Sequence, residues 1–369
     1  MFCVRGSTTG KMNWSDQTYA IGRGIAAIRG KNGYPNSFIR AVIEFKLENL
    51  LTQATGSTFP NVGRDLLNEL KIPFISAKSA QMIAAILEPI DDRINLLRET
   101  NNVLESIPQA LFKSWFIDFD PVHAKAEGCQ PEGMDAEVVA LFPDSFEESE
   151  LGLIPRGWLV RQVSEVADII KGKSYSSKDL VDVSSTALVT LKSFARGGGF
   201  RLDGFKPYAG GFKSTQVVVP GDLIVAYTDV TQAAELIGKP AIVIGLQEFS
   251  TLVASLDIGI IKPRLELISR QYLYGLFKTD SFQSHTLAHT SGTTVLHLSK
   301  EAVGSYLFVC PDPKIIAAFT TIASEIANRI QVSIDEIQTL TVLRNTLLPR
   351  LISGQLQIPI DATNSELVT

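Results

Sequence analysis

The chain has 369 residues, 45% of them hydrophobic, so it is long enough to bury two or three cores. Its apolar runs are much shorter than the roughly 20 residues that span a bilayer, and the N-terminus lacks the pattern of a signal peptide. Its three cysteines are too widely separated for a disulfide framework or a CxxC metal site. We therefore expect a folded cytoplasmic protein with reduced thiols.

The net charge of −5 is unevenly distributed along the chain. Residues 119–150 carry nine acidic residues and one basic residue, a local charge of −8, so the remainder carries +3. Within that remainder, Lys171 to Lys213 holds eight basic residues against three acidic ones. This basic segment in an acidic protein favours contact with a polyanion.

An internal repeat organises the chain. Thr55-Gly-Ser-Thr58 matches Ser291-Gly-Thr-Thr294 at an offset of 236 residues (292 minus 56). The same offset places Ile86 on Ile322 and Arg93-Ile94 on Arg329-Ile330. Two stretches of about 60 residues that keep one register indicate two equivalent structural units.

The second part of each repeat has the spacing of a long helix. The first such helix is predicted over 76–118, and its apolar residues recur with heptad spacing at Leu87, Ile90, Ile94, Leu97, Leu104 and Leu111. Asn101 falls on the same seam, where a polar residue commonly sets register. The second helix is predicted over 314–353, and Pro108 and Pro349 are expected to kink or end the regular part of each.

A single stripe of this kind is equally consistent with ordinary core packing. Two long helices at matched repeat positions instead favour an antiparallel coiled coil that joins two globular units as a spacer of fixed length.

Between the helices, the pattern changes twice. The acidic segment 119–150 contains prolines and glycines and is predicted to be a linker. From Trp158 to about Tyr306, short runs of β-branched and aromatic residues predict strands, and 271–279 predicts a helix. The predicted strands are Ala187–Leu191, Gln216–Val219, Asp222–Tyr227, Ala241–Ile244 and Ile258–Ile261.

Five short phrases carry a resemblance to a known family. They are Leu151-Gly-Leu-Ile-Pro-Arg-Gly-Trp158, Pro220-Gly-Asp-Leu-Ile-Val225, Gly292-Thr-Thr294, Ala110-Leu-Phe-Lys-Ser-Trp-Phe116 and Leu347-Leu-Pro-Arg-Leu-Ile-Ser-Gly354. In this combination and order, they resemble the specificity subunits of type I restriction-modification enzymes. The resemblance implies an α+β fold, with β-rich target-recognition domains joined by long helices that form an antiparallel coiled coil.

The resemblance divides the chain into six parts, and it departs from the family pattern at the start. The expected parts are the second half of a first recognition domain (1–75), a central helix (76–118), the linker (119–150), a second recognition domain (151–312), a distal helix (313–354) and a tail (355–369). Residues 1–10 align with about 223–232, so the first domain lacks the counterpart of the preceding half. It could be completed by another chain or by self-association, or the chain could be a remnant.

DNA recognition implies phosphate contacts for position and base-edge hydrogen bonds for sequence. The loop from Lys192 to Arg201 suits both, because its glycines would let backbone amides approach phosphates and its arginines could pair with guanine. The alternative is an ordinary solvated basic surface with a flexible glycine turn. Polar loops at Thr228–Gln232 and Thr290–Thr294 could add contacts. The candidate DNA-binding residues are Lys171, Lys173, Lys178, Lys192, Ser193, Arg196, Arg201, Lys206, Tyr208, Thr228, Thr231, Thr293 and Thr294, with Arg5 and Lys11 in the shorter first domain.

Enzymatic interpretations find weaker support in the sequence. His285 and His289 are spaced like metal ligands, but the glutamate of an HExxH motif is missing. Gly172-Lys173-Ser174 resembles the end of a phosphate-binding loop whose first glycine is replaced by Ala167. A methyltransferase motif is absent, and Pro311-Asp312 lacks the acid-x-lysine of a nuclease. We therefore expect no catalysis, no cofactor and no metal.

The leading interpretation is a DNA-recognition subunit that reads a bipartite site. The resemblance implies double-stranded DNA, two methyltransferase subunits and motor-nuclease subunits as partners, and no membrane. The alternative is a half-functional or remnant scaffold that binds methyltransferase subunits with reduced or no DNA specificity.

Overall fold

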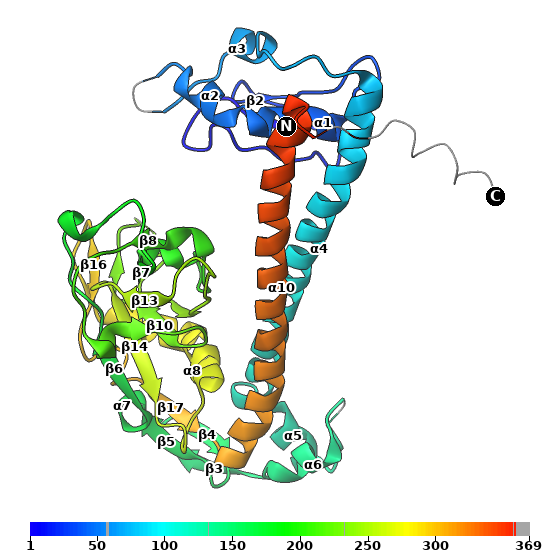
Figure 1. Cartoon of the computed structure of the whole chain (residues 1–369). Coiled ribbons are helices and arrows are strands. Elements are labelled where there is room, and N and C mark those ends of the chain that lie inside the picture. The colour runs from blue at the N-terminus through cyan, green and yellow to red at the C-terminus, as the bar shows by residue number, and fades with distance from the viewer. Residues whose placement is uncertain (57–58, 132, 232, 357, 359–369) are drawn as a thin grey trace. The chain divides into compact units, whose positions relative to one another are not determined.

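The computed structural model describes residues 1–56, 59–131, 133–231, 233–356 and 358, so the predicted positions Ser57, Thr58 and Gln232 lie outside it. The chain divides into two compact units. Unit 1 comprises Met1–Asn101 and Val332–Thr369, and unit 2 comprises Asn102–Gln331. Among the described residues, none of the helices has the length and apolar character needed to cross a membrane. Long helices and small sheets together make the fold α+β, as predicted (Figure 1).

The two long predicted helices are α4 (Ala77–Phe116) and α10 (Pro313–Ser353). Each begins directly after a capping residue, because the Ser76 hydroxyl accepts the Ser79 amide and the Asp312 carboxylate accepts the Lys314 amide. Their first residues are 236 apart (313 minus 77), so the repeat offset predicts both starts. Of the two predicted effects of proline, a kink or an end, the second is wrong: both helices continue past Pro108 and Pro349. One lost amide donor is outweighed there by packing, since Phe112, Leu348 and Leu351 are buried.

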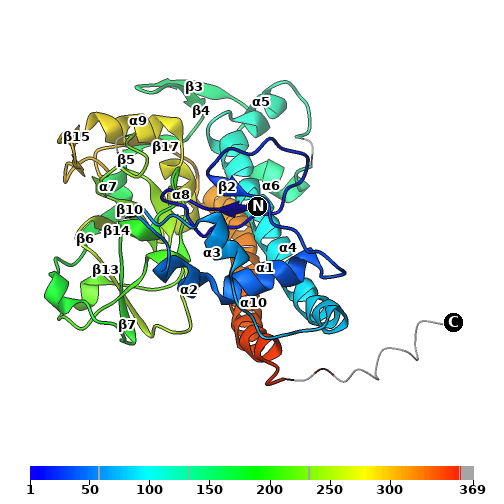
Figure 2. The ribbon, with the colours of Figure 1, turned by 90° about the horizontal axis from the view of Figure 1, so that it is seen from above.

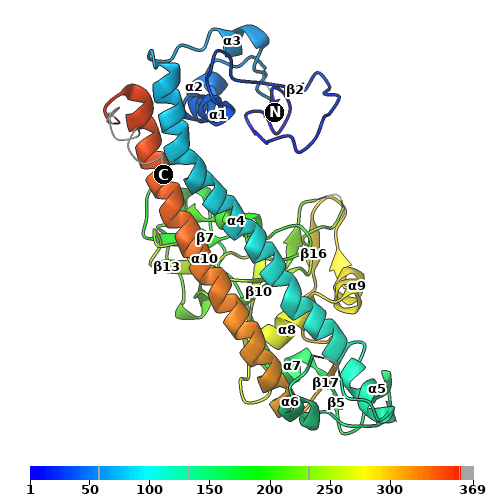
Figure 3. The same cartoon turned by 90° about the vertical axis from the view of Figure 1, so that its right-hand side faces the viewer.

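Within unit 1, α4 and α10 pack antiparallel, as predicted (Figure 3). Ala80 and Leu87 share a core with Leu348 and Ile352. The heptad seam is also confirmed, because Leu87, Ile94 and Leu97 are buried and Asn101 is buried among them. The Asn101 Oδ1 atom has no hydrogen-bond partner in the described part of the chain. Burying this polar atom in the apolar seam therefore costs stability, as is typical of a polar residue that sets register.

The rest of unit 1 is small. Its elements are β1 (Phe2–Cys3), β2 (Ile25–Ala26), α1 (Asn36–Phe45), α2 (Leu47–Thr52) and α3 (Arg64–Asn68). The amphipathic helix α1 lays Phe38, Ala41 and Val42 against α4 and α10 (Figure 2). Its opposite side, with Ile43, joins a second cluster that contains Phe2, Leu50 and Val62.

Unit 2 contains the β-rich part. Its strands are β3 (Phe146–Ser149), β4 (Gly152–Pro155), β5 (Leu159–Gln162), β6 (Ala167–Lys171), β7 (Thr186–Val189), β8 (Lys206–Pro207), β9 (Val217–Val218), β10 (Leu223–Ala226), β11 (Thr228–Asp229), β12 (Pro240–Ile242), β13 (Thr251–Ala254), β14 (Ile258–Pro263), β15 (Thr290–Ser291), β16 (Leu296–Leu298) and β17 (Leu307–Cys310). Its shorter helices are α5 (Asp120–Ala126), α6 (Ala136–Leu141), α7 (Val163–Val166), α8 (Arg270–Phe277) and α9 (Asp280–Ala288), with 3₁₀ turns η1 (Ser177–Asp179), η2 (Leu191–Ser193), η3 (Leu202–Gly204) and η4 (Ser214–Gln216). Every predicted strand and the helix predicted over 271–279 are confirmed.

Two four-stranded sheets form the centre of unit 2. One has the order β12-β10-β14-β6 and the other has the order β8-β7-β13-β9, in which β7 and β13 are parallel. Strands β7, β10 and β14 are mostly apolar and are buried along most of their length, which explains why β-branched runs predict them. Smaller sheets pair β11-β16-β15, β17-β5 and β3-β4.

The C-terminal end of α4 belongs to the core of unit 2. Phe112, Trp115 and Phe116 pack with Tyr272 of α8 and Phe319 of α10, with ring centroids 4.9–6.3 Å apart. Gly275 makes this packing possible, because a Cβ atom there would lie 2.4 Å from the Phe112 Cδ2 atom. The aromatic phrase 110–116 thus anchors the helix in the domain.

Residues 119–150 are not the linker that their charge and prolines predict. They form α5, α6 and β3, and the buried Val122 and Phe142 join the core of unit 2. The Lys125 ammonium donates to the carbonyls of Val139 and Phe142, which ties α5 to α6. The acidic side chains among the described residues of this segment are exposed while Val122 and Phe142 between them are buried, so composition alone misleads here.

Candidate nucleic-acid interface

Several predicted basic residues of unit 2 gather at the C-terminal end of the parallel strands β7 and β13. The Lys173 amide donates to Ala254 at the end of β13, and the Ser255 amide donates to Val189 at the end of β7. Lys192 follows in η2, and Lys206 pairs with Leu188 in the β7–β8 ladder. Gly204 is packed so closely on Lys192 and Ser193 that a Cβ would lie 2.2 Å from the Ser193 nitrogen.

This grouping is held by main-chain bonds, so we define it as the basic cluster: Lys171, Lys173, Lys192, Arg201 and Lys206. Lys171 is the last residue of β6, and Lys173 follows it two positions later in the chain. Lys178 lies in η1, where the carbonyl of the next residue, Asp179, accepts the Ala209 amide just beyond β8. Lys171, Lys178, Lys192 and Arg201 are exposed, whereas Lys173 and Lys206 are half-buried.

The glycine loop does not present free backbone amides, which corrects the expectation that it cradles phosphate. The Gly197, Gly198 and Gly199 amides donate to the carbonyls of Glu235, Ala195 and Pro240. All three glycines have φ between 83° and 103°, a region that favours glycine. Their role is therefore to let the loop turn tightly between Phe194 and Phe200, which bridge across it.

The two arginines of this loop are exposed and already paired with acids. The Arg196 Nε atom lies 3.1 Å from a Glu235 carboxylate oxygen. Arg201 contacts Asp203 through Nε at 2.9 Å and Nη2 at 2.5 Å, and this pairing raises the Arg201 pKa. Exposed pairs of this kind contribute at most about 1 kcal/mol, so a phosphate or a guanine edge can displace the acid.

Asp229 organises the neighbouring loop, and the sequence analysis did not single it out. It is fully buried, and its carboxylate accepts the amides of Thr231, Leu236 and Ile237 at 2.5–2.9 Å. Burial alone would raise the pKa of Asp229, but these hydrogen bonds outweigh it and the net pKa is lowered. Since Glu235 lies within this loop, Asp229 indirectly positions Arg196.

Three predicted contact residues are corrected by their burial. Ser193 is fully buried, and its hydroxyl accepts the Thr190 amide. Tyr208 is buried and donates to the Gly211 carbonyl, and Thr228 is buried beside His297. Polar side chains in these turns satisfy nearby backbone groups, so they support the surface from beneath.

Among the remaining predicted residues, the threonines differ. Thr231 is half-buried, and its hydroxyl accepts the Glu235 amide. Thr293 and Thr294 are exposed at the tip of the β15–β16 hairpin, where Gly292 turns at φ 106°. In unit 1, Arg5 and Lys11 are exposed on the loop that follows β1.

The histidines hold structural bonds. The His285 Nε2 atom lies 2.9 Å from the Ala302 carbonyl, and the His289 Nδ1 atom lies 2.8 Å from the His285 carbonyl. Burial lowers the pKa of His285. Within the described ranges, no group of three or more His, Cys, Asp or Glu side chains is arranged to hold a metal.

Comparisons with known proteins identify relatives along most of the chain. A family model described as the type I restriction modification DNA specificity domain matches residues 2–106. The specificity subunit of the type I restriction enzyme HindI from Haemophilus influenzae is 25% identical over 358 residues, covering 83% of this chain and 73% of that protein. The specificity subunit of the type I restriction enzyme MjaIX from Methanocaldococcus jannaschii is 22% identical over 341 residues, covering 91% of this chain and 72% of that protein.

Among solved structures, the S subunit of a type I restriction-modification system from M. genitalium is similar. It has a TM-score of 0.46 and 15% identity, and the match covers 86% of this chain and 72% of that one.

Proposed function

We propose that the basic cluster of unit 2 and the loop 192–201 form the DNA-reading surface of this chain. The chain belongs to the specificity subunits of type I restriction-modification systems, which recognise DNA and are not catalytic. The observation that supports this assignment most is the pairing of Arg196 and Arg201 with acids on the exposed loop 192–201, which contributes Lys192 and Arg201 to the cluster. Two extended guanidinium groups can pair with guanine, while the lysines contact phosphates.

In this proposal, unit 2 reads one half of a bipartite site. The α4–α10 pair is the spacer that sets the distance to the other half, as the antiparallel packing of these helices in unit 1 supports. The same helices bind two methyltransferase subunits, and motor-nuclease subunits join for restriction. We place this activity in the cytoplasm.

Replacing both arginines, Arg196→Ala with Arg201→Ala, should weaken specific DNA binding by the assembled complex about tenfold to a hundredfold. The variant should fold normally, because both side chains are exposed. Binding is measured by titration at fixed salt, with specific and unrelated duplexes. Arg161→Ala is the matched control, since Arg161 is also paired with an acid, Glu165, but lies on β5. Equal affinities of the double variant and the control would count against this loop.

Single-molecule methylation mapping in the host tests the bipartite assignment. We expect a motif with two specified halves and an unread gap of fixed length. A symmetric repeat of one half would instead indicate a dimer in which unit 2 reads both sites. The absence of any motif would favour the remnant scaffold.

A further inference from the structure

Unit 1 repeats the second half of the unit 2 domain strand by strand. The Cys3 carbonyl accepts the Gly10 amide, and the Cys3 amide donates to Lys11. In unit 2, Ala226 makes the same two bonds with Gly238 and Lys239. Cys3 is therefore the counterpart of Ala226, and β1 is the counterpart of β10.

The pairing beyond β1 is conserved as well. Cys3 faces Ile25 in the β1–β2 ladder, and Ala226 faces Ile258 in the β10–β14 ladder. Thus β2 is the counterpart of β14. The bridge between Thr55 and Asn61 likewise matches the pair Ser291 and His297, at the 236-residue offset found in the sequence.

One continuous segment completes these strands in unit 2, namely β5, α7 and β6, which together span Leu159–Lys171. Strand β6 pairs with the outer edge of β14, and β5 pairs with β17. By the 236-residue offset, the counterpart of β17 is Lys71–Phe74. Among the described residues of unit 1, no strand pairs with Lys71–Phe74 or with the outer edge of β2.

The side chains at both open edges are exposed, while their counterparts are buried. Ile25 is 37% exposed against 0% for Ile258, and Ile72 is 37% exposed against 3% for Phe308. Phe74 is 94% exposed, whereas its counterpart Cys310 is 7% exposed. In unit 2, the single segment Leu159–Lys171 covers both equivalent edges. The exposed apolar side chains at the two edges of unit 1 therefore indicate a binding surface for a similar segment.

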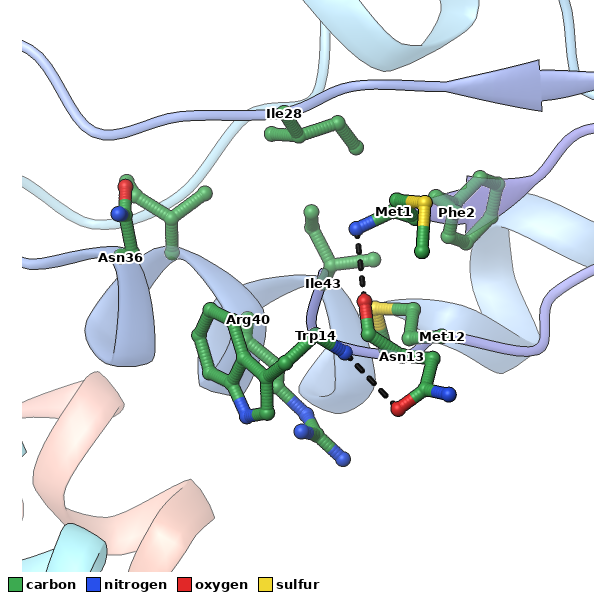
Figure 4. A pocket seen from close by; sticks show the side chains of 10 residues that line it. Met1, Phe2, Met12, Asn13, Trp14, Ile28, Asn36, Arg40 and Ile43 are labelled. Atoms are coloured by element: carbon green, nitrogen blue, oxygen red, sulfur yellow. Dashed lines mark hydrogen bonds between the residues drawn. The ribbon is translucent and has the colours of Figure 1, made fainter. Parts of the chain in front are cut away.

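The hollow beside β2 fits the same interpretation. Figure 4 shows Ile28 pointing into a hollow lined by Met1, Phe2 and Ile43. In the register of β2 with β14, Ile28 is the counterpart of Ile261, which faces Ile169 of β6. The hollow therefore opens at the position where unit 2 places an apolar side chain of β6.

Pro73 is compatible with strand pairing at this edge. Its counterpart Val309 directs its carbonyl to the Tyr272 hydroxyl, away from β5. The Val163 amide donates to Tyr306, and in an antiparallel ladder every second residue bonds to the partner strand, so Phe308 and Cys310 are the residues of β17 that bond to β5. A proline at position 73 thus removes a donor that the pairing does not use, while Ile72 and Phe74 keep theirs.

We propose that unit 1 binds a strand–turn–strand segment of the same chemistry as Leu159–Lys171, supplied from outside residues 1–369, which adds one strand to β2 and one to Lys71–Phe74. This is β-strand addition, in which main-chain bonds supply affinity and apolar side chains fill the hollow. A second copy is the weaker occupant, because its own Leu159–Lys171 already pairs with β14 and β17.

The test uses the full chain and a synthetic peptide with the sequence of residues 157–173. Hydrogen exchange measured by mass spectrometry should show amides of 71–75 and 25–28 exchanging about tenfold more slowly at saturating peptide. Ile72→Pro removes a donor that the pairing needs and should abolish protection at 71–75. Pro73→Ala is the matched control, because its amide would face away from the peptide, and it should be protected like the parent chain.

Three outcomes would overturn the proposal. These are no protection at saturating peptide, equal behaviour of Ile72→Pro and Pro73→Ala, and protection of both edges before peptide is added in a particle of dimer mass, which would assign the surface to a second copy. The readout needs no DNA, so it succeeds or fails independently of DNA reading by unit 2.

Discussion

Replacing Asp229 with alanine should lower the free energy of unfolding of unit 2 by about 3–5 kcal/mol. Asp229 is fully buried, and its carboxylate is the acceptor for the amides of Thr231, Leu236 and Ile237. Without it, three amides lose a charged acceptor in a place where water cannot replace it. Native-state hydrogen exchange of the β10 amides, followed with increasing urea, measures the loss. Asp182→Ala, at an exposed aspartate, should change it by less than about 0.5 kcal/mol.

The contribution of Asp229 should depend on pH in a defined direction. Because its pKa in the folded state is lowered, its stabilisation is present above the ordinary carboxyl pKa of about 3.9 and is lost as the pH falls through the lower folded-state pKa. The difference between the parent chain and Asp229→Ala should thus be constant from neutral pH to about 5 and shrink only below about 3.9. A difference that shrinks already between pH 7 and 5 would contradict this assignment.

The loop that Asp229 holds shows where prediction from sequence ends. The strands and long helices follow from local periodicity, and the helix starts follow from the repeat. The use of the glycine amides depends on carbonyls of Glu235 and Pro240, about 40 residues away in sequence. A glycine-rich basic loop looks the same in sequence whether its amides are free or bonded, so only the fold distinguishes a phosphate cradle from a tight turn.

The burial of three polar side chains in unit 2 also cannot be predicted from the sequence. Ser193, Tyr208 and Thr228 were predicted as contacts because polar residues in turns are usually exposed. Each instead satisfies a nearby group under the surface. Conversely, the acids of 119–150 concealed Val122 of α5 and Phe142, the residue directly after α6, both of which join the core of unit 2. Two of these polar contacts are only three residues apart in sequence, but the burial that makes them necessary comes from the packed sheets around them, which local sequence signals do not report.

Replacing Arg344 with methionine should destabilise unit 1 by about 3–5 kcal/mol. The Arg344 side chain is 13% exposed and bridges Glu44 of α1, and its Nε atom lies 2.5 Å from an Asp91 carboxylate oxygen on α4. It therefore joins α10 to two other helices through charge. Removing it leaves the Glu44 and Asp91 carboxylates close together in a partly buried place, with Glu44 still paired to Arg40, so repulsion and desolvation act mainly on Asp91. Hydrogen exchange of the α1 amides reports the loss.

Two further variants separate this cost from lost packing. Arg93→Met breaks an exposed pair with Glu336 and should cost at most about 1 kcal/mol. Adding Glu44→Gln and Asp91→Asn to Arg344→Met removes the stranded charges and should restore most of the stability, because an uncharged replacement of a buried ion pair is often neutral. Burial already raises the pKa of Asp91. Arg344 lowers this pKa in the parent chain, so Arg344→Met raises it further, and the deficit of that variant should shrink as the pH falls through the higher pKa, since protonation neutralises Asp91. A deficit that is independent of pH and persists in the triple variant would show that Arg344 acts through packing.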